Sequence, residues 1–417
     1  MSFLSNLKSI NIEKLVYLFI AASPGGLKIF TLAIVGFFAT GQIQGEVAND
    51  LSITAFLLML TAIGAGTQIL HLIPKDSDSS EKSAEIFKSL LAKLIPYILS
   101  ISTTLYLLNK FLLKTLNTPL EASLLLFTSS IYWIFRHYYL ARSDLNNLIA
   151  LEAITWIGTA LTTITLSAFG KLTPSYILFY LSVTYLISVT APLASLIKYR
   201  NNRETKIIAD ATSIGLSNLA SGGIINLAPS ICFHVSGPAL AGAVGLITNI
   251  CSIALTIIRA YLLKKIPEIS NTISLKLKEE FDLTFNKTCT TTTKITLISF
   301  IAIQPIAIGA TYATQPELGL SAIILYSSLI AAFICTPQLC ATESVIINFF
   351  EKSKTMLLIN LAHAISTIVI TLALYAYLGK SPEIFITFLA TSIALYILRN
   401  YITRNIVIRE ILARKTS

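Results

Sequence analysis

The chain has 417 residues, of which 54% are hydrophobic and only 12% are charged. Because a soluble domain carries about 25% charged residues, this composition excludes an ordinary soluble enzyme or binding domain. The formal net charge of +10 does not indicate a nucleic-acid partner, because the cations flank apolar runs of about 20 residues, the length of a membrane-spanning helix. We therefore predict an all-α, polytopic membrane protein rather than a barrel.

We predict twelve transmembrane helices from these apolar runs. In chain order they span residues 15–39, 51–73, 90–109, 120–141, 146–169, 174–197, 212–234, 239–262, 295–313, 318–341, 355–378 and 383–403. If the N-terminus is cytoplasmic, nearly all Lys and Arg residues fall in inside segments. The outside segments hold only Lys110, Lys114, Lys171 and Lys380, and Lys28 lies within the first span. The positive-inside rule then predicts both termini in the cytoplasm (N-in/C-in) and the longest inside loop at 263–294.

The first span contains the stretch SPGGLKIF, in which Lys28 follows Pro24, Gly25 and Gly26. Lys28 lies about 20 Å from the inner end of its span, at 1.5 Å per residue. Its side chain cannot reach the aqueous interface from there. A loosened helix is tolerated in a membrane only where something polar meets its freed backbone groups. We expect Lys28 either to form an internal ion pair or to bind an anionic substrate in a central cavity.

Other charged residues gather near the inner ends of later spans. Arg136 and Arg142 bracket the inner end of the fourth span, and Arg259 lies near the inner end of the eighth. We expect these arginines either to anchor the topology or to form a substrate-binding cationic mouth, since guanidinium groups suit phosphates. Glu152, about two turns into the fifth span, is expected either to pair with Lys28 or Arg136 or to bind a coupling cation.

Uncharged polar residues also occur inside the spans. Asn226 and Asn249 are expected either to line a cavity that suits a sugar or to form hydrogen bonds between helices. The five cysteines and four histidines show no metal-ligand spacing, so we predict no metal and no other cofactor. The sequence contains no nucleotide-binding motif. Energy for transport would then come from an ion gradient, of Na⁺ or H⁺, or from the substrate gradient.

A weak internal repeat divides the chain. Gly25-Gly26 matches Gly222-Gly223, and the Ile-Pro of 73–74 matches the Ile-Pro of 266–267. Spans 1 and 2 therefore resemble spans 7 and 8, which predicts two six-helix halves, residues 1–200 and 201–417. Parallel repeats of this kind place the binding site between the halves.

These features together resemble the MOP superfamily. The second helix ends in QILHLIPK at 68–75, and the eighth ends in RAYLLKKIPEIS at 259–270. Within the superfamily the chain looks most like the Wzx-type polysaccharide flippases of O-antigen and capsule pathways. The resemblance implies a MATE-like fold in the bacterial inner membrane, with membrane lipids and the polymerase of the same pathway as further partners.

The resemblance also implies a substrate. It is an oligosaccharide repeat unit linked to undecaprenyl diphosphate, moved from the cytoplasmic to the periplasmic leaflet by alternating access. Two alternatives stay open, an ion-coupled transporter for a small anion and a drug exporter, although exporters usually need deep acidic residues. A membrane-embedded enzyme of the same pathway usually has a large outer loop, which this sequence lacks. We therefore predict a protein that is not an enzyme.

Overall fold

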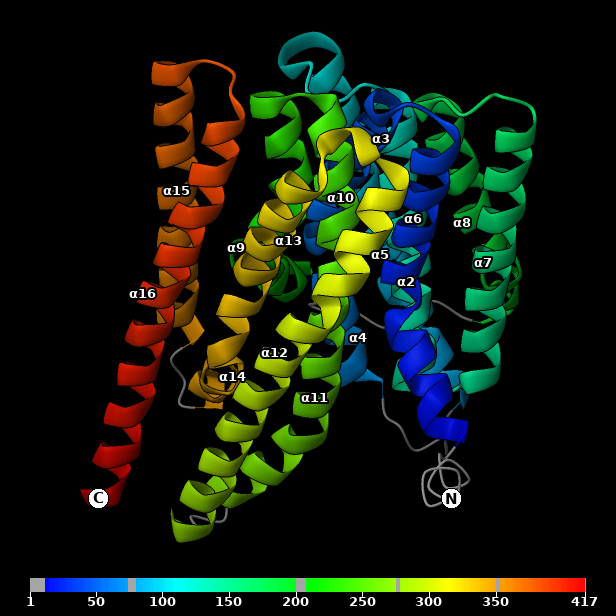
Figure 1. The fold of residues 1–417 in the computed structure, drawn as a ribbon. Coiled ribbons are helices and arrows are strands. Elements are labelled where there is room, and N and C mark those ends of the chain that lie inside the picture. Colours follow the sequence, from blue (N-terminus) through cyan, green and yellow to red (C-terminus); the bar gives the residue numbers. More distant parts are fainter. Residues whose placement is uncertain (1–11, 74–79, 200–207, 275–277, 350–352, 417) are drawn as a thin grey trace, which may run out of the picture.

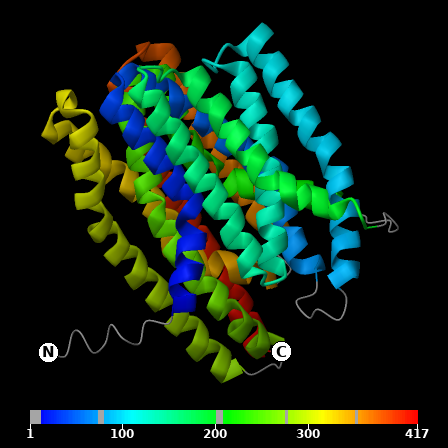
Figure 2. The same ribbon diagram turned by 90° about the vertical axis from the view of Figure 1, so that its right-hand side faces the viewer.

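The computed structural model describes residues 12–73, 80–199, 208–274, 278–349 and 353–416. These residues form helices joined by short connections, and they contain no strand. Most of the helices run lengthwise along one bundle, as Figures 1 and 2 show from two sides. Within these ranges, nine helices are long and apolar enough to cross a membrane. The predicted class, an all-α polytopic membrane protein, is confirmed.

The described part of the first half contains six spans in chain order. A short π-helical turn interrupts the second of them, and another ends the third. Its elements are α2 (Ile12–Phe38), α3 (Gly41–Leu58), η1 (Met59–Ile63), α4 (Gly64–Leu72), α5 (Ser80–Leu108), η2 (Asn109–Leu113), α6 (Pro119–Ala141), α7 (Leu145–Ala168) and α8 (Pro174–Leu196).

The described part of the second half repeats this order. Its tenth span is broken by a 3₁₀ turn. Its elements are α9 (Ile208–Ser236), α10 (Pro238–Cys251), α11 (Ile253–Ser274), α12 (Lys278–Thr314), η3 (Pro316–Leu318), α13 (Leu320–Cys335), η4 (Thr336–Cys340), α14 (Ala341–Phe349), α15 (Ser353–Leu378) and α16 (Pro382–Thr416). The predicted boundary at residue 200 lies outside the described residues.

Local signals in the sequence explain where the helices begin. Thr40, Asp144 and Thr173 each accept a hydrogen bond from a backbone N–H in the first turn of α3, α7 and α8. Pro119 and Pro238 occupy the first turns of α6 and α10, where a proline costs no hydrogen bond. The start of α2 and the end of α16 lie at the same end of the bundle (Figure 1).

The two halves meet tightly at the end of the bundle that we assign to the outside. A Cβ atom on Gly45 of α3 would lie 1.8 Å from the carbonyl oxygen of Pro238, at the start of α10. Near this contact, the fully buried Gln44 accepts a hydrogen bond from the side chain of Gln315. Only a glycine permits so close an approach, so the backbones of α3 and α10 are in direct contact at this end.

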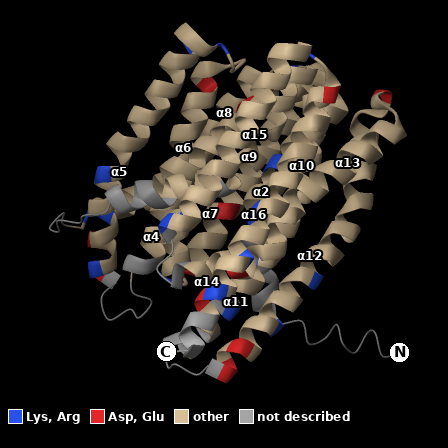
Figure 3. Cartoon of the chain, turned by 90° about the vertical axis from the view of Figure 1, so that its left-hand side faces the viewer, with Lys and Arg blue, Asp and Glu red and all other residues tan. Residues whose placement is uncertain are grey.

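The opposite end differs from the sequence-based expectation. The predicted loop 263–294 is helical wherever it is described, because α11 continues to Ser274 and α12 begins at Lys278. A separate apolar cluster holds these extensions together, and it includes Phe281, Phe285 and Val407. Hydropathy detects only the part of a helix that lies in lipid. Figure 3 shows that charged residues gather at this end, where α11 and α14 lie.

Candidate functional site

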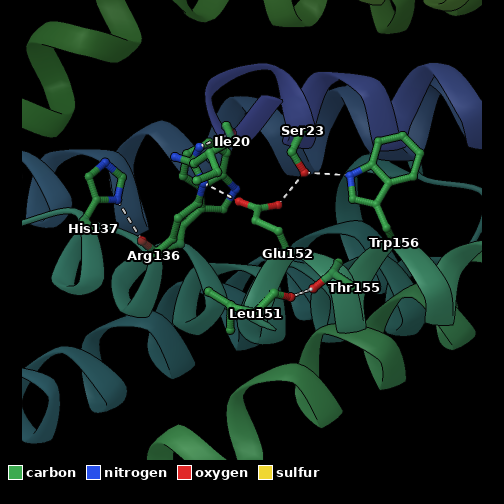
Figure 4. A network of polar contacts seen from close by, with 9 residues as sticks. Ile20, Ser23, Arg136, His137, Leu151, Glu152, Thr155 and Trp156 are labelled. Carbon is green, nitrogen blue, oxygen red and sulfur yellow. Dashed lines mark hydrogen bonds and ion pairs between the residues drawn. The ribbon is translucent and has the colours of Figure 1, made fainter. Parts of the chain in front are cut away.

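A buried ion pair joins α6 to α7. The Nε atom of Arg136 donates to Oε1 of Glu152 over 2.8 Å, and it is the one ion pair found among the described residues. Ser23 of α2 donates its hydroxyl to Oε2 of the same carboxylate, and Trp156 Nε1 donates to the Ser23 hydroxyl over 2.7 Å. Figure 4 shows these four side chains converging between the three helices. Arg136 is therefore neutralised inside the protein.

Pro24 explains the second contact of Arg136. A proline has no N–H, so inside a helix it leaves the carbonyl four residues earlier without a partner. That carbonyl belongs to Ile20, and Nη2 of Arg136 donates to it over 2.6 Å (Figure 4). One guanidinium thus satisfies both the Glu152 carboxylate and the backbone group freed by Pro24. The polar break in the first span is anchored to α6 and α7.

Lys28 lies on another side of α2. It lines a small pocket of about 40 Å³ whose walls come from α2, α3, α6 and α8. Trp133 and Tyr185 are the aromatic residues in this wall. Glu152 pairs with Arg136 instead of Lys28. The structure therefore places Lys28 inside the first half and apart from the three predicted arginines.

A cavity of about 380 Å³ with polar walls lies between the halves. Ala22 and Gly25 of α2 line it from the first half, and α9, α10, α11, α14 and α16 line it from the second. Asn226 and Asn249 contribute amide groups to its wall. Its volume lies within the range of small-molecule sites, about 300–1,000 Å³. We call this space the central cavity.

The central cavity is cationic. Arg259 of α11 and Arg399 of α16 both line it, and its described lining residues include no aspartate or glutamate. Arg259 is exposed to this space, and we find no ion-pair or hydrogen-bond partner for it in the described part of the chain. Arg399 is held by neutral groups: its Nε atom donates to Oδ1 of Asn360 over 2.7 Å. Neither arginine pairs with a carboxylate in the described part of the chain.

Helix breaks position the second of these arginines. The 3₁₀ turn η4 begins at Thr336, and Asn400 donates its amide to the carbonyl oxygen of Thr336 over 2.7 Å. Oδ1 of Asn400 accepts from Nη1 of Arg399 at 3.2 Å. Sequence reasoning missed Arg399 because it counted as one more cation near an inner helix end. The adjacent Arg-Asn pair inside the predicted span 383–403 was the available signal.

The glycine repeat has a structural counterpart at this cavity. Gly25 and Gly222 both line the central cavity, and a Cβ atom on either would meet no atom within 4 Å. The glycines that follow them are crowded instead. A Cβ on Gly26 would lie 2.9 Å from the ring of Trp156, and one on Gly223 would lie 2.8 Å from the ring of Phe56. Each pair thus presents one glycine to the cavity and packs the next against an aromatic ring.

The predicted site residues therefore fall into separate places. Arg136 and Glu152 form one pair, Lys28 lines the small pocket, and Arg259 lines the central cavity. Arg142 lines a third cavity of about 400 Å³ between α6, α7 and α8, where its Nη1 atom donates to the hydroxyl of Tyr138 over 2.9 Å. The structure does not bring the four predicted cations into one cavity.

Comparisons with known proteins bear on the architecture. No family model matches the sequence, and no curated protein matches it. Among solved structures, an inward-facing multidrug resistance MATE family transporter of the MOP superfamily matches with a TM-score of 0.63 and 14% identity, over 98% of this chain and 97% of that chain. The chain has a MATE-like fold. This result confirms the predicted architecture.

Two further MATE structures give the same result. A mutant of the Vibrio cholerae MATE transporter VcmN matches with a TM-score of 0.58 and 13% identity, over 95% of each chain. The MATE multidrug transporter DinF-BH matches with a TM-score of 0.55 and 16% identity, over 95% of this chain and 96% of that chain. At these identities the likeness establishes the MATE-like fold and leaves the substrate to be argued from the cavity.

Proposed function

We propose that this MATE-like protein is a flippase for lipid-linked oligosaccharides in the bacterial inner membrane. It would move a repeat unit on undecaprenyl diphosphate from the cytoplasmic to the periplasmic leaflet. The observation that carries the proposal is the charge of the central cavity, which Arg259 and Arg399 line without a described carboxylate. Two guanidinium groups at one site suit a diphosphate, because each presents a planar fork of donors to phosphate oxygens.

The other groups in the cavity suit a sugar. Asn226, Asn249 and Gln338 supply amides, and Ser252 and Thr256 supply hydroxyls. Asn226, Asn249 and Ser252 donate to backbone carbonyls four residues earlier, and their side-chain oxygens can still accept hydrogen bonds from sugar hydroxyls. The closed contact between Gly45 and Pro238 at the assigned outer end supports a cavity loaded from the cytoplasm. A later opening of that contact would release the head group outside. Coupling to Na⁺ or H⁺ and association with a polymerase remain predictions.

The same cavity argues against a cationic drug as the substrate. The neighbour DinF-BH is a multidrug transporter. A cationic drug in the central cavity of this chain would meet two arginines whose charges no described carboxylate neutralises. Like charges at close range disfavour binding. A small anion is the substrate class that this charge pattern leaves as the alternative.

Complementation tests the proposal. A strain that lacks its own flippase would express the wild-type chain or the double variant Arg259→Gln/Arg399→Gln at equal levels. We expect the wild type to restore surface polysaccharide, and the double variant to leave undecaprenyl-linked intermediates in the inner leaflet. Arg409→Gln is the matched control, since Arg409 is an exposed arginine on the same helix as Arg399. Equal polysaccharide from the wild type and the double variant would contradict the proposal.

A second assay separates the flippase from a small-anion transporter. The purified chain is mixed with undecaprenyl diphosphate or with inorganic diphosphate, and binding is measured by native mass spectrometry. A flippase should retain the lipid-linked form at least about tenfold more tightly, because burial of apolar chain adds about 0.8 kcal/mol per CH₂. Equal binding of both ligands would favour the small-anion transporter.

A further inference from the structure

The pocket beside Lys28 poses a charge problem of its own. Lys28 is half-buried inside the first half and faces a wall built from α2, α3, α6 and α8. An ammonium group is costly at this depth unless an opposite charge or water meets it. Within the described ranges, we find no carboxylate at ion-pair distance from Lys28.

Two buried carboxylates of the first half already have other partners. Glu152 accepts from Arg136 and Ser23. Asp50 of α3 is fully buried and accepts backbone N–H bonds from Asn117 at 3.0 Å and from Thr118 at 2.9 Å. Both carboxylates thus serve other parts of the bundle. The protein supplies Lys28 with a pocket but no counter-charge from these residues.

The other polar groups of the pocket indicate the sign of its ligand. The hydroxyls of Thr31 and Thr54 donate to carbonyls of their own helices, Leu27 and Asp50, over 2.9 and 2.8 Å. Tyr185 also lines the pocket, and among the described residues its hydroxyl has no hydrogen-bond partner. Ser129, the remaining hydroxyl of the lining, donates to the carbonyl of Leu126 over 3.4 Å. The ammonium of Lys28 and the phenol of Tyr185 can both donate hydrogen bonds to a ligand. Among the described residues no carboxylate pairs with Lys28, and donors so placed favour an anion.

The size of the pocket limits that anion. A single water needs a cavity volume of roughly 10–15 Å³, and the volume of this pocket is about 40 Å³. The space suits a monatomic anion with one or two waters. It is far smaller than the central cavity of about 380 Å³, so a diphosphate with its sugar does not fit.

We propose that this pocket binds a small monovalent anion of chloride size, held by the ammonium of Lys28 and the hydroxyl of Tyr185. The anion neutralises Lys28 within the first half, as Glu152 neutralises Arg136. This anion site is distinct from the central cavity. It does not depend on which substrate the central cavity binds, so its test and the complementation test can fail separately.

Thermal unfolding of the purified full chain in mild detergent tests the anion site. The midpoint is measured in sodium chloride and in sodium gluconate at equal ionic strength, for the wild type, Lys28→Met and Tyr185→Phe. We expect chloride to raise the wild-type midpoint, Tyr185→Phe to weaken chloride binding several-fold, and Lys28→Met to abolish the response. Lys171→Met is the matched control, since Lys171 is exposed, and it should respond like the wild type.

Bromide gives a direct measurement that needs no variant. Crystals of the wild-type chain grown in sodium bromide should show an anomalous peak within hydrogen-bonding distance of both Lys28 Nζ and the Tyr185 hydroxyl. An absent peak, or an equal chloride response in the wild type and Lys28→Met, would overturn the proposal.

Discussion

The two halves of the molecule share a backbone arrangement and differ in how they treat positive charge. In both halves a glycine pair places one glycine at the central cavity and the next against an aromatic ring. Gly26 meets Trp156 of its own half, whereas Gly223 of the second half meets Phe56 of α3 in the first half. The first half neutralises its buried Arg136 with Glu152. The second half leaves Arg259 and Arg399 without a described carboxylate. The comparison separates cations that hold the bundle together from cations that are available to a ligand.

The largest effect is expected from breaking the neutralised pair. Glu152→Leu leaves Arg136 buried without its counter-charge, which costs about 3–5 kcal/mol of stability. The measurement is the free energy of unfolding by denaturant titration in mild detergent. The double variant Arg136→Met/Glu152→Leu should recover part of the loss, because it removes both charges. It should not recover all of it, since the Ile20 carbonyl loses its donor. If the double variant were as unstable as Glu152→Leu, charge would not be the cause.

The next largest effect is expected from Arg259 of the second half. Arg259→Gln should leave the free energy of unfolding unchanged within about 0.5 kcal/mol, as for a substitution without structural partners. It should weaken binding of undecaprenyl diphosphate by tenfold or more, because hydrogen bonds to charged groups contribute about 1.5–3 kcal/mol. Arg409→Gln serves as the control in both measurements. A loss of stability comparable to that of Glu152→Leu would mean that Arg259 is a structural cation after all.

The glycine pairs test the shared arrangement. Gly26→Ala and Gly223→Ala should each destabilise the protein by about 1–3 kcal/mol, because the added methyl group overpacks against a ring. Gly25→Ala and Gly222→Ala are the matched controls, and each should gain up to about 1 kcal/mol from helix propensity. Thermal unfolding of the four variants checks the expectation. Equal effects at both positions of a pair would remove the argument that the halves are built alike.

The fold could be predicted because its signals are local and strong. Each of the twelve predicted spans corresponds to a helix or to consecutive helices of the structure. The inner extensions of α11 and α12 could not be predicted in this way. They are polar by composition, and residues distant in sequence, such as Phe281 and Val407, hold them together. Hydropathy predicts which segments contact lipid, and it does not detect packing between residues that are distant in sequence.

The candidate site could be predicted only in part. Sequence showed that Lys28, Arg136 and Arg259 are unusual cations, but it could not show which of them meets a carboxylate. That distinction depends on which faces of α2, α6 and α7 turn toward one another. Arg399 was missed because it counted as a cation near an inner helix end, whereas α16 continues to Thr416 and Arg399 is buried, with Asn360 of α15 as a partner. Which side chains pair between helices depends on how the helices pack, and the sequence alone does not give that packing.

The smallest effect comes from adding the missing carboxylate to the second half. Thr256 lines the central cavity three residues before Arg259, so Thr256→Glu places a carboxylate one turn from the guanidinium. In water-like surroundings, two like charges at 4 Å repel by about 1 kcal/mol, so undecaprenyl diphosphate should bind roughly fivefold more weakly. Thr256→Gln is the control of equal shape. A cationic dye should bind more tightly to Thr256→Glu than to the wild type, because the new carboxylate attracts it. If Thr256→Glu strengthened the binding of diphosphate lipid, the central cavity would not recognise its ligand by positive charge.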